Sequence, residues 1–114
     1  MSEPKLKAKL FVHAAIRRCG LHALPAVVVK RGDDDRRTNV ERVLHGGDLC
    51  RIYTQVRDAD GRLGWMCATG AEAVSEGRGE AYVARACAVD GDVWVLDVES
   101  PDGMAPFLEP IFRA

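Results

Sequence analysis

The chain has 114 residues, of which 47% are hydrophobic and 29% charged, values close to those of ordinary globular domains. This length fits a single domain, 1–114, and excludes a second independent core. The net charge of −1 excludes a strong long-range attraction of nucleic acid by overall charge. No stretch approaches the roughly 18 apolar residues of a membrane span, and the N-terminus lacks a signal peptide's apolar core. We therefore expect a cytoplasmic protein without membrane contact.

The charges are unevenly distributed along the chain. Residues 1–32 carry seven basic and one acidic side chain, whereas residues 33–114 carry nine basic and sixteen acidic ones. Such an asymmetry predicts either a face that binds a polyanion or a basic helix that packs beside acidic elements of the same domain. The near-zero total charge favours the internal arrangement.

A first helix is predicted over residues 5–19, ending at Gly20 as a left-handed cap. Its apolar face would consist of Ala8, Phe11, Val12, Ala15, Ile16 and Cys19. Basic side chains line the edge of that face at a spacing of four residues and lack an acidic partner within the helix. Together with two further cations they form the predicted polyanion or partner contact: Lys5, Lys9, His13, Arg17, Arg18 and Lys30.

Several strands follow the first helix. The β-branched run Ala26–Val29 is typical of a buried strand. Two further strands are expected at 40–44 and 49–56, joined by the turn at 45–48. The dipeptide Asp60-Gly61 is a strong hairpin signal, so residues 62–67 should pair back antiparallel.

A second helix is predicted over Glu80–Val89, followed by a last strand over Val93–Glu99. Thr69 to Glu72 fits a helix capping box, although Gly77 and Gly79 lower the helix propensity beyond it. The order αβββ(β)αβ predicts an α+β fold. Hairpins would build an antiparallel sheet of four to five strands, with the helices on one face.

The segment 101–114 contains three prolines and is predicted to be an extended tail after a core of about 5–100. Its part 104–112 holds apolar side chains, namely Phe107, Leu108, Ile111 and Phe112. These side chains would either dock a protein partner or a second subunit, or close the core of the domain itself.

Cysteine and histidine patterns predict neither a metal nor a cofactor. The cysteines at 19, 50, 67 and 87 contain no Cys-x-x-Cys pair, and in a reducing compartment we expect them to stay free thiols. The histidines at 13, 22 and 45 lack neighbours at metal-ligand spacing. No catalytic residue is predicted from these patterns.

The acidic stretch at 90–99 contains the strongest candidate for chemistry. Asp97 and Glu99 would share one strand face, with Asp90 or Asp92 assisting, and such carboxylates could bind Mg²⁺ or act as an acid and base. The simpler interpretation is that they emerge at the solvent end and pair with cations of the first helix. In that case Asp97 would neutralise Lys9.

Three segments resemble a small bacterial family, the domain of unknown function 1491. They are Leu6–Arg18, Ala26–Asp33 and Asp90–Glu99, which together frame roughly residues 6–103. The chain departs from the family pattern at Gly91, where proline is typical, and at Asp97, where glutamate is typical. The resemblance implies a single domain and no assigned activity.

Three functional hypotheses remain open, and we rank them in this order. The first is a non-enzymatic interaction or regulatory module, favoured by the lack of a complete catalytic set. The second is a nucleic-acid-binding protein that uses the basic first helix, although an aromatic content of 6% leaves few stacking platforms. The third is a metal-dependent enzyme built on Asp97 and Glu99.

Overall fold

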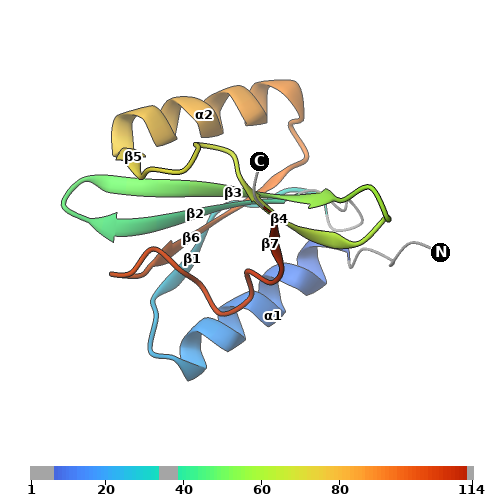
Figure 1. Ribbon diagram of the computed structural model, residues 1–114, viewed down its shortest axis with the longest axis horizontal. Helices are drawn as coiled ribbons and strands as arrows, with labels where there is room; N and C mark the ends of the chain where they lie inside the picture. Colours follow the sequence, from blue (N-terminus) through green and yellow to red (C-terminus); the bar gives the residue numbers. More distant parts are fainter. Residues whose placement is uncertain (1–6, 34–38, 113–114) are drawn as a thin grey trace.

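The computed structural model describes residues 7–33 and 39–112, which form two helices and seven strands (Figure 1). In chain order these elements are α1 (Ala8–Leu21), β1 (Ala26–Lys30), β2 (Asn39–Gly46), β3 (Leu49–Arg57), β4 (Leu63–Cys67), β5 (Val74–Ser75), α2 (Glu76–Val89), β6 (Trp94–Glu99) and β7 (Ile111–Phe112). The α+β class predicted from the sequence is confirmed.

The strands form one mixed sheet in the order β1-β6-β2-β3-β4-β7, with β5 beside β3. The predicted hairpins β2–β3 and β3–β4 are antiparallel, as is β1–β6, but β2–β6 and β4–β7 are parallel. The expectation of an antiparallel sheet with four to five strands is therefore wrong in detail. Hairpin signals are local, whereas β6 reaches β2 only after a long crossover through β3, β4, β5 and α2.

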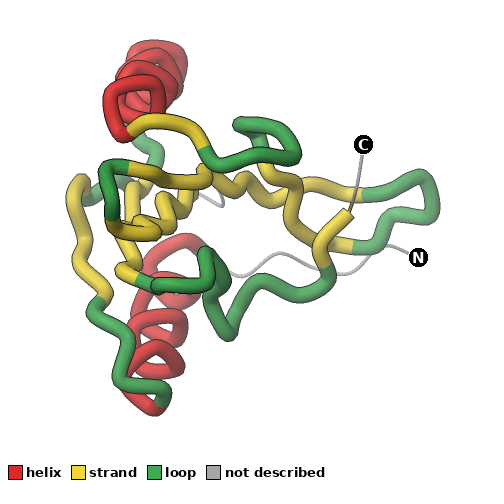
Figure 2. The backbone as a smooth tube through the Cα atoms, turned by 60° about the vertical axis from the view of Figure 1, so that its left-hand side comes forward, coloured by secondary structure: helices red, strands yellow, loops and turns green. Residues whose placement is uncertain are grey.

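The two helices cover opposite faces of the sheet, α2 on one side and α1 on the other (Figures 1 and 2). Their predicted placement on one face is wrong. The reason lies in β6 and the residue before it, because Trp94, Leu96 and Val98 enter the core beneath α1 while Val93 and Val95 enter the core beneath α2. A central strand with apolar side chains on both faces requires cover on both.

Helix α1 buries the face that its periodicity predicts: Ala8, Val12, Ala15 and Cys19 are buried. Phe11 lies beside them and packs its ring against Trp65 and Phe107, with centroid separations of 5.4 and 5.6 Å. The helix continues past Gly20 to Leu21, and Ala23 takes the left-handed conformation instead, with φ 57°. The longer helix brings Leu24 onto the core.

Helix α2 begins four residues earlier than predicted, at Glu76. Its N-cap is Ser75, whose Oγ accepts a hydrogen bond from the Arg78 N–H at 3.2 Å. The capping box predicted at Thr69 is absent, because the Thr69 hydroxyl accepts from the Ile52 N–H at 3.3 Å and ties the loop to β3. Gly79 is buried where α2 crosses β3, and a Cβ there would overlap Cys50 Sγ.

The segment predicted as a tail is part of the core. Ala105, Phe107 and Leu108 are buried beside α1, and β7 extends the sheet beyond β4. Gly103 has φ 75° and approaches the His45 ring so closely that any Cβ would collide with it. The side chains of Ala105, Phe107 and Leu108 are thus unavailable to a partner in this packing, whereas Met104 is exposed.

Two polar side chains lie inside the sheet, on the α1 side. Glu41 of β2 is 0% exposed and Asn39 is 3% exposed. The Asn39 amide, turned to present its nitrogen, donates to Glu41 Oε1 and Oε2 at 2.7 and 2.8 Å. Burial raises the pKa of the Glu41 carboxyl well above its usual range, because the charged form loses its hydration.

Candidate functional site

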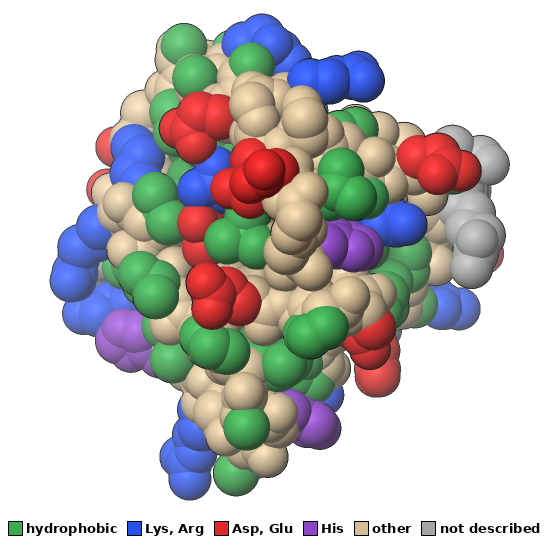
Figure 3. All heavy atoms as spheres, turned by 90° about the vertical axis from the view of Figure 1, so that its left-hand side faces the viewer, with side chains coloured by type: hydrophobic (Ala, Val, Ile, Leu, Met, Phe, Trp, Pro, Cys, Tyr) green, Lys and Arg blue, Asp and Glu red, His purple; other side chains and the backbone are tan. Residues whose placement is uncertain are grey.

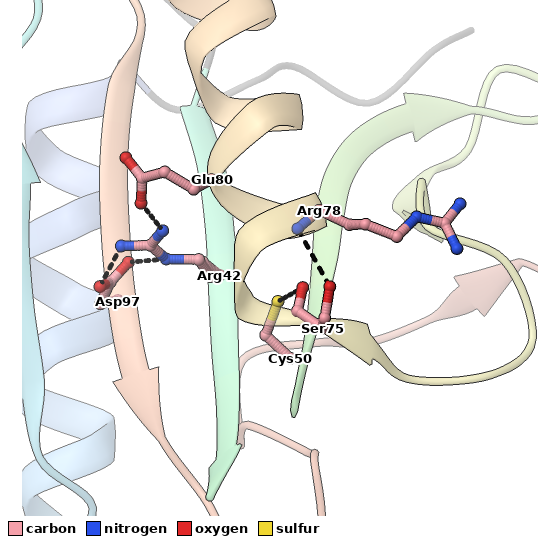
Figure 4. A network of polar contacts seen from close by, with 6 residues as sticks. All are labelled: Arg42, Cys50, Ser75, Arg78, Glu80 and Asp97. Atoms are coloured by element: carbon pink, nitrogen blue, oxygen red, sulfur yellow. Dashed lines mark hydrogen bonds and ion pairs between the residues drawn. The ribbon is translucent and has the colours of Figure 1, made fainter. Parts of the chain in front are cut away.

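The acidic residues of β6 and its preceding turn have separate structural partners. Asp97 accepts two hydrogen bonds from Arg42 of β2, at 2.9 Å from Nε to Oδ1 and 2.7 Å from Nη2 to Oδ2 (Figure 4). Asp90 Oδ1 accepts from the Asp92 N–H at 3.0 Å and closes the turn before β6. Glu99 is exposed. The structure therefore does not gather these four carboxylates into one site.

Arg42 also contacts helix α2, where its Nη1 lies 2.7 Å from Glu80 Oε2 (Figure 4). The side chains of Arg42 and Asp97 are 12% and 15% exposed, while Glu80 is 71% exposed. The hydrogen bonds to Asp97 are the main cause that raises the pKa of Arg42. This bidentate, mostly buried pair ties β2 to β6, and its geometry leaves the Asp97 carboxylate committed to a guanidinium.

The expected pairing of Asp97 with Lys9 is wrong. Asp97 lies on the sheet face that α2 covers, alongside Val95, whereas Lys9 belongs to α1 on the other face. Successive side chains of a strand point to opposite faces of the sheet. The face on which each helix packs therefore decides which charged side chains can form a pair. Within the described ranges, no group of three or more His, Cys, Asp or Glu side chains could hold a metal ion.

The predicted basic set is divided among different environments. His13, Arg17 and Arg18 are exposed on α1, and Lys5 lies outside the described residues. Lys30 is used within the fold, because its Nζ donates to the backbone carbonyls of Gly91 and Val93 at 2.6 and 3.1 Å. On the face shown in Figure 3, basic side chains lie mostly at the margins and acidic ones mostly towards the middle. Several of the basic side chains adjoin one another along the left margin of that face (Figure 3).

Among the described strands, β1 forms one edge of the sheet and pairs with β6 alone. Its register pairs Val27 with Asp97, and the Glu99 N–H donates to the Pro25 carbonyl at 2.9 Å. Antiparallel partners alternate between hydrogen-bonded and non-hydrogen-bonded pairs. The backbone groups of Val27 therefore point to β6, and those of Ala26 and Val28 point outward from the sheet.

Two side chains of β1 are exposed although the run predicts a buried strand. Val27 and Val29 are 60% and 52% exposed, while Ala26 and Val28 pack against the α1 core. The exposed pair lies on the α2 side, beyond the reach of α2 itself, with Asp97 as the neighbour of Val27 on β6. We call this strand, with its two exposed valines and its outward backbone groups, the β1 edge.

Sequence reasoning missed the β1 edge for a physical reason. Four consecutive apolar residues read as a strand buried on both faces, and nothing in the run itself distinguishes an edge strand. One signal was present at its end, because Lys30 follows directly and lysine is typical of edge strands. The register shift between Val28 and Lys30 also marks an edge, since such irregularities limit pairing there.

No described helix is both long and apolar enough to cross a membrane. The comparisons with known proteins place the chain by fold and sequence. It is similar to a crystal structure described as a DUF1491 family protein from Caulobacter crescentus CB15, with 28% identity and a TM-score of 0.83 over 94% of this chain and 99% of that one. An NMR structure with the same description and organism gives 27% identity and a TM-score of 0.80, covering 96% of this chain and 99% of the other.

A solution structure of protein Atu0922 from A. tumefaciens shares the fold, with a TM-score of 0.75 at 20% identity over 97% of this chain and 100% of that one. No curated protein matches. The family model described as a protein of unknown function, DUF1491, matches residues 6–108. The chain belongs to the DUF1491 family, whose function is unknown.

Proposed function

We propose that this protein is a non-enzymatic interaction module that accepts an additional β-strand at the β1 edge. The observation that supports this proposal is an edge strand with two exposed side chains, Val27 and Val29. The backbone N–H and C=O groups of Ala26 and Val28 in the same strand point away from the sheet. Strand addition uses the backbone groups and the side chains together, since main-chain hydrogen bonds supply affinity and alternate side chains supply selectivity. The four free thiols support a reducing compartment such as the cytoplasm.

The partner that fits best is a second copy of the chain. Antiparallel pairing of β1 with its own copy is isologous, so each strand would offer the same donors, acceptors and valines to the other. The register shift after Val28 and the hydrogen bonds from Lys30 Nζ to backbone carbonyls restrict pairing with another strand to the first half of β1. A short, register-limited contact predicts a weak, reversible association rather than an obligate dimer.

Sedimentation velocity over a wide concentration range tests this proposal. The wild type should show a concentration-dependent dimer, and Val27→Lys should abolish it, because a charge on the edge would be desolvated by pairing. Leu21→Lys is the matched control, since Leu21 is an aliphatic side chain 79% exposed at the end of α1, and it should leave the dimer unchanged. A monomer at all concentrations, or equal association in both variants, would contradict pairing of two copies at this edge.

The alternative of nucleic-acid binding draws less support. Of the six basic residues proposed for it, Lys5 lies outside the described residues and Lys30 is held by backbone carbonyls. The half-buried Lys9 and the exposed His13, Arg17 and Arg18 share helix α1. Phosphate contacts of that number would give at most a weak, strongly salt-dependent interaction. The apolar segment 104–112, first considered as a docking element, already packs largely within the domain.

A further inference from the structure

A cavity of about 450 Å³ lies where β4 ends and β5 takes over beside β3. Strand β3 contributes Arg51 and Tyr53 to its lining, and the C-terminal segment contributes Met104, Ile111 and Phe112. The volume lies within the range of roughly 300–1,000 Å³ typical of small-molecule sites.

Two polar groups stand against otherwise largely apolar walls. Tyr53 is 2% exposed, and burial is the main cause that raises the pKa of its hydroxyl, while the nearby Arg51 acts in the opposite direction. Arg51 is half-buried, and none of the described residues that line the cavity is an aspartate or glutamate. Among the described residues Arg51 has no ion-pair partner, in contrast to Arg42.

The Arg51 side chain hydrogen-bonds the Tyr53 side chain but has no carboxylate partner among the described residues, so this end of the cavity suits an anion. A partly desolvated guanidinium attracts an anion more strongly than one in bulk water, and the planar guanidinium matches a carboxylate through two parallel hydrogen bonds. The single positive charge balances one negative charge rather than the two of a phosphate monoester. The remaining walls, with Met104, Ile111 and Phe112, suit an apolar body; methionine adapts to varied shapes.

We propose that this cavity binds a small organic monocarboxylate, with its carboxylate on Arg51 and Tyr53 and its aliphatic or aromatic body against the C-terminal segment. This site lies apart from the β1 edge at the other side of the sheet order. The two proposals therefore succeed or fail independently.

The test is an NMR titration of the isotope-labelled full chain with octanoate and with 3-phenylpropanoate, using 3-phenylpropan-1-ol as the neutral counterpart. At least one carboxylate should saturably shift the amide signals of Tyr53, Cys67, Gly70 and Ala71. A charged hydrogen bond contributes about 1.5–3 kcal/mol, so the alcohol should bind at least about tenfold more weakly. Arg51→Met should cause a similar loss, and Arg57→Met, a matched change on the same strand outside the cavity lining, should cause none.

A second variant tests the space in the cavity independently of the Arg51 charge. Ala71→Phe keeps Arg51 but fills space at the cavity wall, and it should also abolish the shifts; the spectrum of each variant without ligand checks that the fold persists. Saturable shifts confined to the cavity and lost in both variants would establish the site. The proposal is refuted by an absence of saturable shifts for both carboxylates, by shifts centred elsewhere, or by unchanged affinity in Arg51→Met.

Discussion

Replacing Gly79 by alanine tests how closely helix α2 packs on the sheet. Alanine normally stabilises a helix interior relative to glycine by roughly 0.5–1 kcal/mol. At Gly79, however, the added methyl would overlap the Sγ of Cys50, a fully buried side chain of β3, and would also lie 3.8 Å from Ile52 Cδ1. Gly77, two residues earlier in the same helix, has open space at the corresponding position.

The balance of these effects differs in sign at the two positions. Gly77→Ala should stabilise the protein by about 0.5–1 kcal/mol through propensity alone. Overpacking of a closely packed core costs typically 1–3 kcal/mol, which exceeds the propensity gain, so Gly79→Ala should destabilise by about 1–2 kcal/mol. Removing Sγ with Cys50→Ala should relieve the overlap, so the double-mutant cycle should give a coupling energy of about 1 kcal/mol or more.

Urea unfolding, followed by circular dichroism and Trp fluorescence, measures the free energy of unfolding of the wild type, the three single variants and the double variant. Equal m-values would show that the variants change stability rather than the denatured state. The reasoning is refuted if Gly79→Ala stabilises the protein as much as Gly77→Ala, or if Gly79→Ala and Cys50→Ala are additive.

Four further substitutions test the core and the ion pair. Glu41→Gln should stabilise the protein at pH 7 by about 1–3 kcal/mol, because a neutral amide avoids burying a charge. Because the pKa of Glu41 is raised in the folded state, the protonated Glu41 side chain stabilises the wild type fully below the ordinary glutamate pKa of about 4.3. This stabilisation is lost as the pH rises through the folded-state pKa. The stability advantage of Glu41→Gln should therefore vanish near pH 4 in urea titrations, and an advantage that does not change with pH would contradict this. Asp97→Asn should lower the free energy of unfolding by about 2–4 kcal/mol, because it leaves the mostly buried Arg42 guanidinium without its bidentate partner. Glu80→Gln should lower it by less than about 1 kcal/mol, because Glu80 is exposed. Equal losses of stability in thermal unfolding would contradict this ranking. Phe107→Ala should cost about 3–5 kcal/mol in the same assay, and a loss below 1 kcal/mol would mean that the C-terminal segment lies outside the cooperative core.

The predicted elements that proved accurate depend on local signals. The buried face of α1, the Asp60-Gly61 hairpin and the alternation in β6 all follow from the period of apolar residues or from turn chemistry. The errors occur where a local signal had a non-local competitor. Thr69 could cap a helix, but its hydroxyl bonds to β3 instead, and Gly79 lowers helix propensity but permits contact with the sheet.

The candidate sites were harder to predict than the elements. Asp97 stood out by its chemistry, yet its partner proved to be Arg42, 55 residues away in sequence, which a strand pattern cannot reveal. Glu41 gave no signal at all, since a lone glutamate in a strand is usually exposed. Arg51 and Tyr53 alternate with apolar residues in β3 and would ordinarily be assigned to a solvated face.

The sequence by itself determined the α+β class, most helix and strand positions, both hairpins and the membership of a family of unknown function. The helix and strand positions and the hairpins follow from interactions between residues close in the chain, which act before the chain has folded. Only the tertiary structure decided that β6 lies between β1 and β2, that the helices cover opposite faces, and that the β1 edge and the Arg51 cavity remain open. Those choices depend on which apolar faces bury each other across the whole chain, because the hydrophobic effect is non-directional and an apolar face does not specify which other face it packs against.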